Sequence, residues 1–435
     1  MEPEALARQV IARLRDAGHQ AYLVGGCVRD LLLGVRPKDY DVATDARPDR
    51  IMDLFPRSGR VGAHFGVVLV RDVFDQVEVA TFRSDHDYLD GRHPEQVRFE
   101  CDPREDVLRR DFTVNGLMMD PDDGCVLDYV DGQSDLKLGV IRAIGDPYAR
   151  FREDHLRLMR GIRFAARLGF AIEPATMDAI RRDHALILKV STERVRDELN
   201  RILTEGGARR GFELLDESGM LADILPEVSA MKGVQQPPEY HPEGDVWTHT
   251  LILLEQLRNP SVTLALGALL HDVGKPPTFR IAERIRFDGH VEEGVRMAEI
   301  ILNRLRYSRV EIEQVTALID NHMKFKDVQH MKESTLKRFL RMPEFGEHLE
   351  LHRMDVMASN RRLENYELAK RKLEEFSEEA LKPEPLITGE DLIAAGYEPG
   401  PEFSKILHAI EDAQLEGRIT TKGEAMDVVR ELFPG

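Results

Sequence analysis

Two aspartates separated by one residue, Asp39 and Asp41, are the strongest candidates for chemistry in this sequence. In an extended strand alternate side chains share a face, so both carboxylates would point the same way. Two such charges repel each other unless a cation joins them. Hard ions such as Mg²⁺ prefer these oxygens and usually keep substrate phosphate as a further ligand. The pair therefore predicts a divalent metal site, with a solvated loop as the alternative.

A glycine pair, Gly25 and Gly26, precedes the aspartates and is followed by Arg29. The apolar segment 21–24 indicates a strand, and residues 28–33 indicate the first turns of a helix. Glycines between a strand and a helix let backbone amides approach a phosphate. Arg29 could then hold a triphosphate tail. A phosphate cradle followed by a carboxylate pair predicts metal-assisted phosphoryl or nucleotidyl transfer.

A dense polar segment, residues 109–115, precedes an apolar segment at 116–119 that we expect to be a helix. Its two adjacent arginines, supported by Asp111 and Asn115, suit contacts to a triphosphate. A capped helix start would explain the aspartate but not the whole set. Glu78 is either a third carboxylate near the metal or a surface residue on an edge strand.

Arginines recur at helical spacing between residues 153 and 167. At about 100° per residue they fall on one arc of a helix, opposite an arc of apolar residues. A solvated face would mix charges of both signs for i,i+4 pairing. One basic arc therefore predicts an anion, either a triphosphate or RNA phosphate. These arginines are Arg157, Arg160, Arg163 and Arg167.

Asp154 and Arg157 combine a hydrogen-bond acceptor with a donor. Cytosine and adenine present an amine donor beside a ring-nitrogen acceptor, which this pair matches. Uracil and guanine present a carbonyl beside an N–H, and both contacts would clash. The pair would therefore select CTP and ATP without a template. An ordinary i,i+3 ion pair is the alternative.

The chain has 435 residues, 42% hydrophobic and 32% charged, which suits roughly two to four domains. No run approaches the ~18 apolar residues of a membrane span, and the acidic start lacks the layout of a signal peptide. Three scattered cysteines fit a reduced setting. We therefore expect a cytoplasmic protein with no membrane partner.

The net charge of −18 argues against general binding of polyanions. Basic residues nevertheless cluster between residues 142 and 167 and again between 324 and 341. Such stripes would let an acidic protein hold a folded RNA by its backbone. For the second cluster, a solvated helix surface is the alternative.

The sequence predicts an α+β protein with a small α/β head followed by an all-helical remainder. Beyond about residue 146 helical periodicity dominates, and breaks rich in proline and glycine fall at 233–244 and 382–385. Further strands in the head are expected at 67–70, 77–82 and 126–130.

Taken together, these motifs resemble the class II tRNA nucleotidyltransferases, which comprise the CCA-adding enzymes and their poly(A) polymerase relatives. They follow the family order and spacing over roughly the first 170 residues, and the tail from 385 to 425 is similar to the family's C-terminal part. The motifs are Gly25-Gly26-x-x-Arg29-Asp30, Asp39-x-Asp41, Arg109-Arg110-Asp111-Phe112-Thr113-x-Asn115 and Glu153-Asp154-x-x-Arg157-x-x-Arg160-x-x-Arg163-Phe164.

The resemblance implies a polymerase-β-like head in which Asp39 and Asp41 are catalytic and bind Mg²⁺. It implies that Asp154 and Arg157 read the base, and that the segment 84–98 is a flexible loop needed for the final A. The partners would be ATP, CTP and the acceptor arm and 3′ end of tRNA. The implied nucleotide-binding residues are Gly25, Gly26, Arg29, Arg110, Asp154, Arg157, Arg160 and Arg163.

Histidines and aspartates in the helical middle resemble the HD superfamily of metal phosphohydrolases. Imidazole with carboxylate suits a second divalent ion such as Mn²⁺, Ni²⁺, Fe²⁺ or Zn²⁺. His290 and His322 are weaker candidates, and Lys275 could contact a phosphate. The module is either an active hydrolase or idle. The candidate ligands are His249, His271, Asp272 and Asp355.

We therefore expect two-metal addition of C and A from CTP and ATP to the 3′ end of tRNA, without a template. An A-adding enzyme or a poly(A) polymerase is the alternative of the same chemistry. An HD hydrolase acting on RNA phosphate ends is the alternative of another class, and the oligomeric state stays open. The expected domains are a nucleotidyltransferase head at 1–145, a helical RNA-binding neck at 146–235, an HD body at 236–380 and a helical tail at 381–435.

Overall fold

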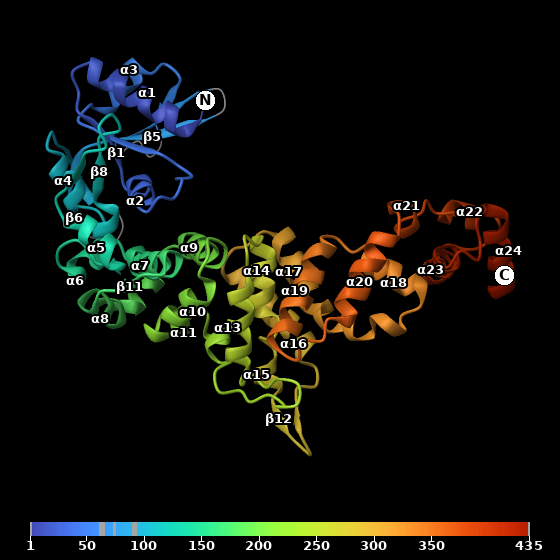
Figure 1. The fold of residues 1–435 in the computed structure, drawn as a ribbon. Helices are drawn as coiled ribbons and strands as arrows, with labels where there is room; N and C mark the ends of the chain where they lie inside the picture. The colour runs from blue at the N-terminus through green and yellow to red at the C-terminus, as the bar shows by residue number, and fades with distance from the viewer. Residues whose placement is uncertain (1, 61–65, 73–74, 89–93, 434–435) are drawn as a thin grey trace. The chain divides into compact units, whose positions relative to one another are not determined.

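A computed structural model of the chain describes residues 2–60, 66–72, 75–88 and 94–433 (Figure 1). The chain divides into two compact units. Unit 1 comprises Met1–Ser229 with Leu257–Asn259, and unit 2 comprises Ala230–Gln256 with Pro260–Gly435. The α+β class is confirmed, because a mixed sheet near the N-terminus is followed by helices. The division into four domains stays a prediction.

The head of unit 1 is built on a sheet in the order β3-β4-β5-β2-β1-β8-β9 among the described residues. Strands β2 and β5 are parallel, and the other neighbours are antiparallel. Helix α1 (Pro3–Asp16) packs on the central strands. The strands are β1 (Ala21–Val24), β2 (Asp41–Thr44), β3 (Ser58–Arg60), β4 (Val67–Arg71), β5 (Gln76–Thr81), β8 (Leu117–Met119) and β9 (Val126–Asp128).

The strands expected at 21–24, 67–70, 77–82 and 126–130 are confirmed as β1, β4, β5 and β9. The helix expected at 116–119 is wrong, because Leu117–Met119 forms β8, which pairs with β1 and β9. A 3₁₀ turn, Thr113–Asn115, precedes it. A short apolar run is buried whether it lies in a strand or in a helix, so periodicity does not distinguish the two.

A hairpin outside the main sheet, β6 (Arg83–Tyr88) with β7 (Pro94–Phe99), occupies most of the segment expected to be a flexible loop. The middle of that segment, 89–93, lies outside the described residues.

Helices complete unit 1. Helix α7 has a buried apolar face, as expected, and packs against α9 and α10. It begins at Leu156 and not at residue 153, because α6 ends at Glu153 and Asp154 is extended. The helices are α2 (Gly26–Leu32), α3 (Pro48–Leu54), α4 (Pro103–Leu108), α5 (Gly132–Leu138), α6 (Pro147–Glu153), α7 (Leu156–Leu168), α8 (Pro174–Asp183), α9 (Thr192–Thr204), α10 (Ala208–Glu217), α11 (Met220–Ile224) and α12 (Pro226–Ser229).

In the described part of unit 2, the strands are those of one small hairpin, β12 (Arg280–Ile281) with β13 (Ile285–Arg286), and the other elements are helices. Helix α14 is almost entirely apolar and packs against α13, α17 and α19. The helices and the 3₁₀ segment η3 are α13 (Val246–Gln256), α14 (Val262–Leu270), α15 (Lys275–Thr278), α16 (His290–Arg304), α17 (Arg309–Asn321), η3 (His322–His330), α18 (Glu333–Leu340), α19 (Phe345–Ala358), α20 (Glu364–Glu375), α21 (Glu378–Leu381), α22 (Gly389–Ala394), α23 (Pro401–Leu415) and α24 (Lys422–Leu432).

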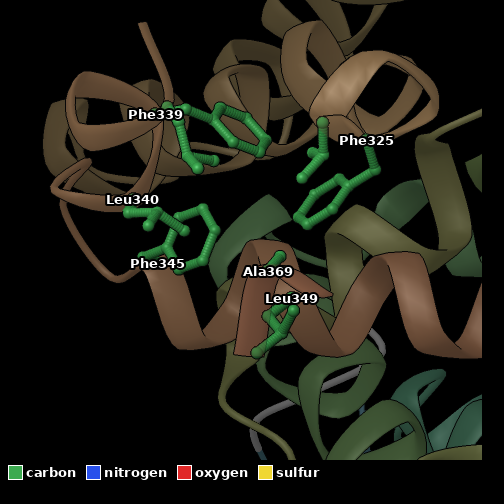
Figure 2. Packing of buried hydrophobic residues seen from close by; sticks show 8 residues of the cluster. Phe325, Phe339, Leu340, Phe345, Leu349 and Ala369 are labelled. Atoms are coloured by element: carbon green, nitrogen blue, oxygen red, sulfur yellow. The ribbon is translucent and has the colours of Figure 1, made fainter. Parts of the chain in front are cut away.

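An aromatic core joins η3, α18, α19 and α20 (Figure 2). The ring centroids of Phe325 and Phe339 lie 4.9 Å apart in an edge-to-face arrangement, and Phe345 contacts both rings. Edge-to-face packing adds to the free energy that burial of these rings provides. The core therefore fixes α19, which carries residues of the site described below.

Part of the expected basic surface at 324–341 is not free to bind RNA. Arg338 and Arg341 pair with Glu411 on α23, and the Lys337 amine donates to the carbonyl of Leu415 at 2.6 Å. These contacts hold α18 against the tail. None of the helices in the described part of the chain has the length and apolar composition that a membrane span requires.

Candidate functional site

Three carboxylates, those of Asp39, Asp41 and Glu78, gather where the interior strands β2 and β5 begin, a place called the acidic edge below. Asp41 begins β2 and lies in register with Glu78 of the parallel strand β5. Burial, together with the charges of Glu78 and Asp39, raises the pKa of Asp41 to about 6, although Arg110 opposes the shift. Tyr40 is buried, and its hydroxyl donates to Glu4 of α1 at 3.3 Å. The predicted carboxylate pair is therefore a cluster of three.

Two details of this edge differ from expectation. Asp39 lies in an exposed bend before β2, so the two aspartates do not share one strand. The alternative for Glu78 was a surface residue on an edge strand; the side chain is exposed, but the edge strand is wrong, since β5 lies between β4 and β2. Burial and the repulsion from Glu78 and Asp39 both disfavour the charged form of Asp41, and a bound divalent cation would offset both, so these oxygens fit such an ion.

The glycine pair shapes the turn between β1 and α2. Gly25 has φ of 77°, which favours glycine, and a Cβ there would lie 3.2 Å from the Arg110 guanidinium. Arg29 is buried and donates to Asn115 at 2.7 Å and to Asp30 at 2.8 Å. Arg29 is therefore anchored within the protein, and its contact with a triphosphate stays a prediction.

Sequence reasoning missed Asp106, which organises the two adjacent arginines. Its buried carboxylate lies 2.6 Å from Arg109 Nη2 and 2.9 Å from Arg110 Nη2. Although burial opposes it, these two charges lower the pKa of Asp106. The i,i+3 and i,i+4 spacing on and just after α4 was the available signal.

The arginines of α7 are paired with carboxylates of unit 1. Arg163 is buried and the arginines of the arc have carboxylate partners within the protein, so the predicted contact of the arc with a triphosphate or RNA phosphate stays a prediction. Helix α7 packs against α9 and α10, and its arginines reach carboxylates of the head and of α9. The pairs are Arg157 with Glu153, Arg160 with Asp111, Arg163 with Glu198, and Arg167 with Asp30.

The two candidate base readers do not pair with each other. Asp154 is held by Arg194 of α9, with Nη2 2.8 Å from Oδ2. Arg157 is held by Glu153 at 2.6 Å and also donates to the carbonyl of Arg109. The i,i+3 ion pair is therefore not formed, and each side chain is oriented by its own partner.

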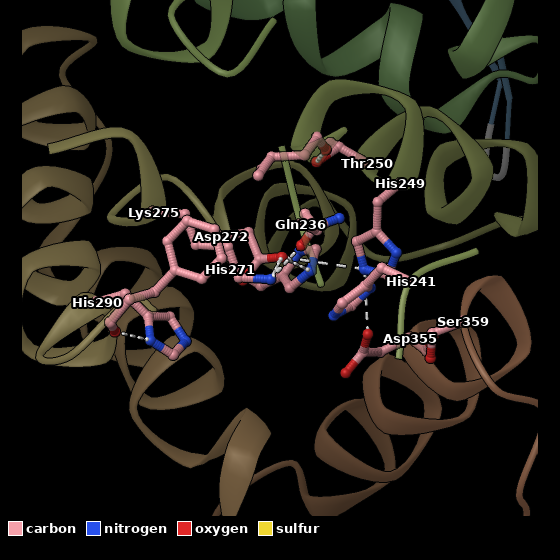
Figure 3. Close-up of polar contacts among 12 residues, drawn as sticks. Gln236, His241, His249, Thr250, His271, Asp272, Lys275, His290, Asp355 and Ser359 are labelled. Carbon is pink, nitrogen blue, oxygen red and sulfur yellow. Dashed lines mark hydrogen bonds and ion pairs between the residues drawn. The ribbon is translucent and has the colours of Figure 1, made fainter. Parts of the chain in front are cut away.

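In unit 2 the expected HD residues converge from three helices (Figure 3). His249 lies on α13, His271 follows α14, and Asp355 lies on α19. Their ligand atoms all lie within 4.8 Å of one another. His249 Nε2 is 3.1 Å from Asp355 Oδ1. Asp355 and Glu243 raise the pKa of His249 to about 9 against the opposing effect of burial.

The two histidines ranked as weaker candidates also belong to this site. His290 at the start of α16 and His322 at the start of η3 form a second group with Asp272, again within 4.8 Å. Burial lowers the pKa of His322 to about 4, so this ring is neutral at pH 7. The Nε2 atom of His290 is buried and makes no hydrogen bond with a described residue, and His271 Nε2 lies 3.2 Å from Asp272 Oδ2. Buried imidazoles beside carboxylates are a set of ligands that fits divalent transition metals.

Other neighbours hold these ligands in place. Glu243 Oε1 accepts hydrogen bonds from Nδ1 of His249 at 2.6 Å and of His241 at 2.9 Å. The bond to Glu243 leaves His249 Nε2 facing Asp355. In metal sites, a carboxylate that is not itself a ligand often orients a ligand histidine in this way. Lys275, expected to contact a phosphate, pairs with Asp272 at 2.7 Å. Sequence reasoning treated the segment containing Glu243 as a linker and so missed it.

The comparisons with known proteins agree with these observations. The fold and acidic edge define a head of the class described as "Poly A polymerase head domain", whose family model matches residues 21–142. The models of "Probable RNA and SrmB- binding site of polymerase A" and "HD domain" match residues 169–232 and 244–380.

The chain is 30% identical over 432 residues to a CCA-adding enzyme of Ligilactobacillus salivarius, covering 97% of this chain and 94% of that one. The chain belongs to the family of CCA-adding enzymes. It is also 44% identical over 215 residues to the CCA-adding enzyme of Levilactobacillus brevis. That match covers 49% of this chain and 54% of the relative, so it spans about half of the relative's length. The crystal structure of the Bacillus stearothermophilus CCA-adding enzyme in complex with CTP is 26% identical, covers 99% of this chain and 98% of its own, and has a TM-score of 0.77.

Proposed function

We propose that the chain adds C and A nucleotides from CTP and ATP to the 3′ end of tRNA without a nucleic-acid template. What carries this proposal is the gathering of Asp39, Asp41 and Glu78 at one sheet edge. It is supported by the likeness to a CCA-adding enzyme over nearly the whole chain.

In this proposal Asp39 and Asp41 hold Mg²⁺, with Glu78 beside them. When bound, Mg²⁺ supplies positive charge that activates the RNA hydroxyl and offsets the charge of the leaving pyrophosphate. The backbone amides at the start of α2 and the Arg110 guanidinium orient the triphosphate. The RNA 3′-oxygen then bonds to the α-phosphorus as the bond to pyrophosphate breaks.

Base selection in this proposal belongs to Asp154 and Arg157. Their separate partners, Arg194 and Glu153, leave an acceptor and a donor oriented independently. An acceptor beside a donor matches the pairing edges of cytosine and adenine. The remaining candidates, Arg160 and Arg163, are paired within unit 1, so we propose that they support this helix as well as the nucleotide.

The test offers tRNA transcripts that end at the discriminator base, at C or at CC, each with CTP, ATP or both. Product lengths are then read on a gel. We expect each transcript to be completed to CCA and no further. Growth only from the CC-ended transcript would mean an A-adding enzyme, and long A tails would mean a poly(A) polymerase.

The two ligand groups of unit 2 favour a second function, hydrolysis of phosphate esters in the presence of a divalent transition metal. They lie at a cavity of about 700 Å³ that Asp272, Asp355 and His322 help to line. The test measures release of product from p-nitrophenyl phosphate or a nucleoside 2′,3′-cyclic phosphate with Mn²⁺ or Ni²⁺. If His271→Ala retains this activity, the site is not its source.

A further inference from the structure

A second cavity, of about 430 Å³, adjoins the cavity beside the histidines of unit 2. Because the two share part of their lining, a ligand bound at the histidines can extend into the second cavity. Each has a volume in the range of small-molecule sites. The shared lining residues are Lys326, His352, Val356 and Asn360.

Cationic side chains line both cavities without a carboxylate partner. Arg284 and Arg286 line the first, Arg362 lines the second, and Lys326 lines both. None of the four side chains forms an ion pair with another described residue, whereas the nearby Lys324 pairs with Asp320. Four unpaired cations in a protein of net charge −18 indicate an anionic ligand with charges at more than one place.

His352 marks the junction of the two cavities. It is 7% exposed, and neither ring nitrogen has a hydrogen-bond partner among the described residues. Its ring stacks on Phe325, with centroids 4.3 Å apart and an interplanar angle of 6°, so its orientation is fixed. A buried polar ring without partners costs free energy unless a ligand completes its hydrogen bonds.

The outer cavity also presents amides suited to nucleic-acid bases. Gln329 Nε2 donates to Asn365 Oδ1 at 2.8 Å, which leaves the oxygen of the first and the nitrogen of the second for a ligand. The inner cavity presents Tyr240, 52% exposed, and Phe287. Aromatic faces with amides are the means by which proteins bind single-stranded RNA.

We propose that this double cavity binds the phosphate-bearing end of a single-stranded RNA at least two nucleotides long. The terminal phosphate lies at the histidine cluster, and the next phosphodiester lies between Lys326 and Arg362, with His352 at the junction. This inference rests on the proposed hydrolase function of unit 2. For a 2′,3′-cyclic end, water adds to phosphorus, one P–O bond to the ribose breaks, and the released ribose oxygen takes a proton.

The test compares cytidine 2′,3′-cyclic phosphate with a dinucleotide carrying the same cyclic end, using the full chain with Mn²⁺. We expect kcat/KM to be about tenfold higher for the dinucleotide, because a charge-assisted bond to the inner phosphodiester is added. Arg362→Ala should remove most of this preference. Arg371→Ala, which removes an exposed charge on α20 outside both cavities, should keep it.

Equal kcat/KM for the two substrates, or a preference unchanged in Arg362→Ala, would overturn the inference while leaving the hydrolase function intact. If the wild type hydrolyses neither substrate, the hydrolase function fails. The inference is then judged by binding of a fluorescent dinucleotide 3′-phosphate. We expect Arg362→Ala to weaken this binding about tenfold and Arg371→Ala to leave it unchanged, and equal affinity in all three proteins would refute the inference.

Discussion

Asp41 at the start of β2 lies directly beside Glu78 of β5, because the two strands are parallel and in register. The two residues are far apart in the sequence, and they lie close together in space because β2 and β5 are neighbours in the sheet. Two carboxylates held side by side destabilise the protein without a cation and bind a cation when one is present.

Glu78→Gln should therefore have opposite effects on stability and on activity. Without divalent ions the variant should melt at a higher temperature, because the repulsion from Glu78, which adds to burial in raising the pKa of Asp41, is removed. Nucleotide incorporation should fall at least tenfold at low Mg²⁺. Calorimetry and an incorporation assay check the two effects, with Glu105→Gln, an exposed carboxylate on α4, as the control. Unchanged Mg²⁺ dependence would contradict this role for Glu78.

The stability of unit 1 should fall when only one of Arg163 and Glu198 is removed, and should be largely kept when both are replaced by apolar residues. Both side chains are about 95% buried and their atoms lie 2.6 Å apart. Glu198→Ala leaves a buried cation with one weaker partner, Glu205, and should cost about 3–5 kcal/mol in unit 1. Replacing both residues with methionine should restore most of that loss. Chemical denaturation followed by circular dichroism checks this, and equal losses in the single and double variants would contradict it.

Short-range patterns predicted much of this molecule and missed what packing assembles. The spacing of Asp39, Asp41 and the glycine pair indicated the acidic edge of the head, and helical periodicity indicated the buried face of α7. Asp106 and Glu198 were missed because an arginine-rich pattern does not indicate which carboxylate will approach it. His290 and His322 join the HD cluster only because α16 and η3 pack against α17.

His348 should make unit 2 sensitive to acid. Burial lowers the pKa of this ring to about 4, from an ordinary value of 6.5. Between these two values the unfolded chain binds a proton that the folded chain does not, so stability falls as the pH decreases through this window and is constant above it. At 1.36 kcal/mol per pKa unit the loss approaches about 3 kcal/mol.

His348→Phe should therefore make stability less dependent on pH between 4 and 6.5, while the part that comes from the lowered pKa values of His322 and His352 remains. The single tryptophan, Trp247, lies on α13, so its fluorescence follows urea unfolding of unit 2. His408→Phe, which removes an exposed ring on α23, should leave the slope unchanged. A slope in His348→Phe equal to that of the wild type would contradict the assignment.

Divalent transition metals should stabilise unit 2 through the histidine cluster. At a hundredfold excess over Kd, a metal that binds only the folded state adds about 2.7 kcal/mol. We expect Mn²⁺ or Ni²⁺ to shift the Trp247 unfolding transition upward, and Asp355→Ala to reduce the shift because one ligand of the first group is lost. Asp320→Ala, an exposed carboxylate on α17, is the control. An equal shift in both variants would place the metal elsewhere.

The most direct measurement extends a tRNA transcript ending at its discriminator base, in the presence of CTP, ATP and Mg²⁺. The wild type should yield a product longer by the three residues CCA. Asp41→Ala should yield none while binding the transcript as tightly as the wild type, because the variant loses a proposed metal ligand and keeps the rest of unit 1. Full extension by Asp41→Ala, or no extension by the wild type, would contradict the assignment of nucleotidyl transfer to this edge of the sheet.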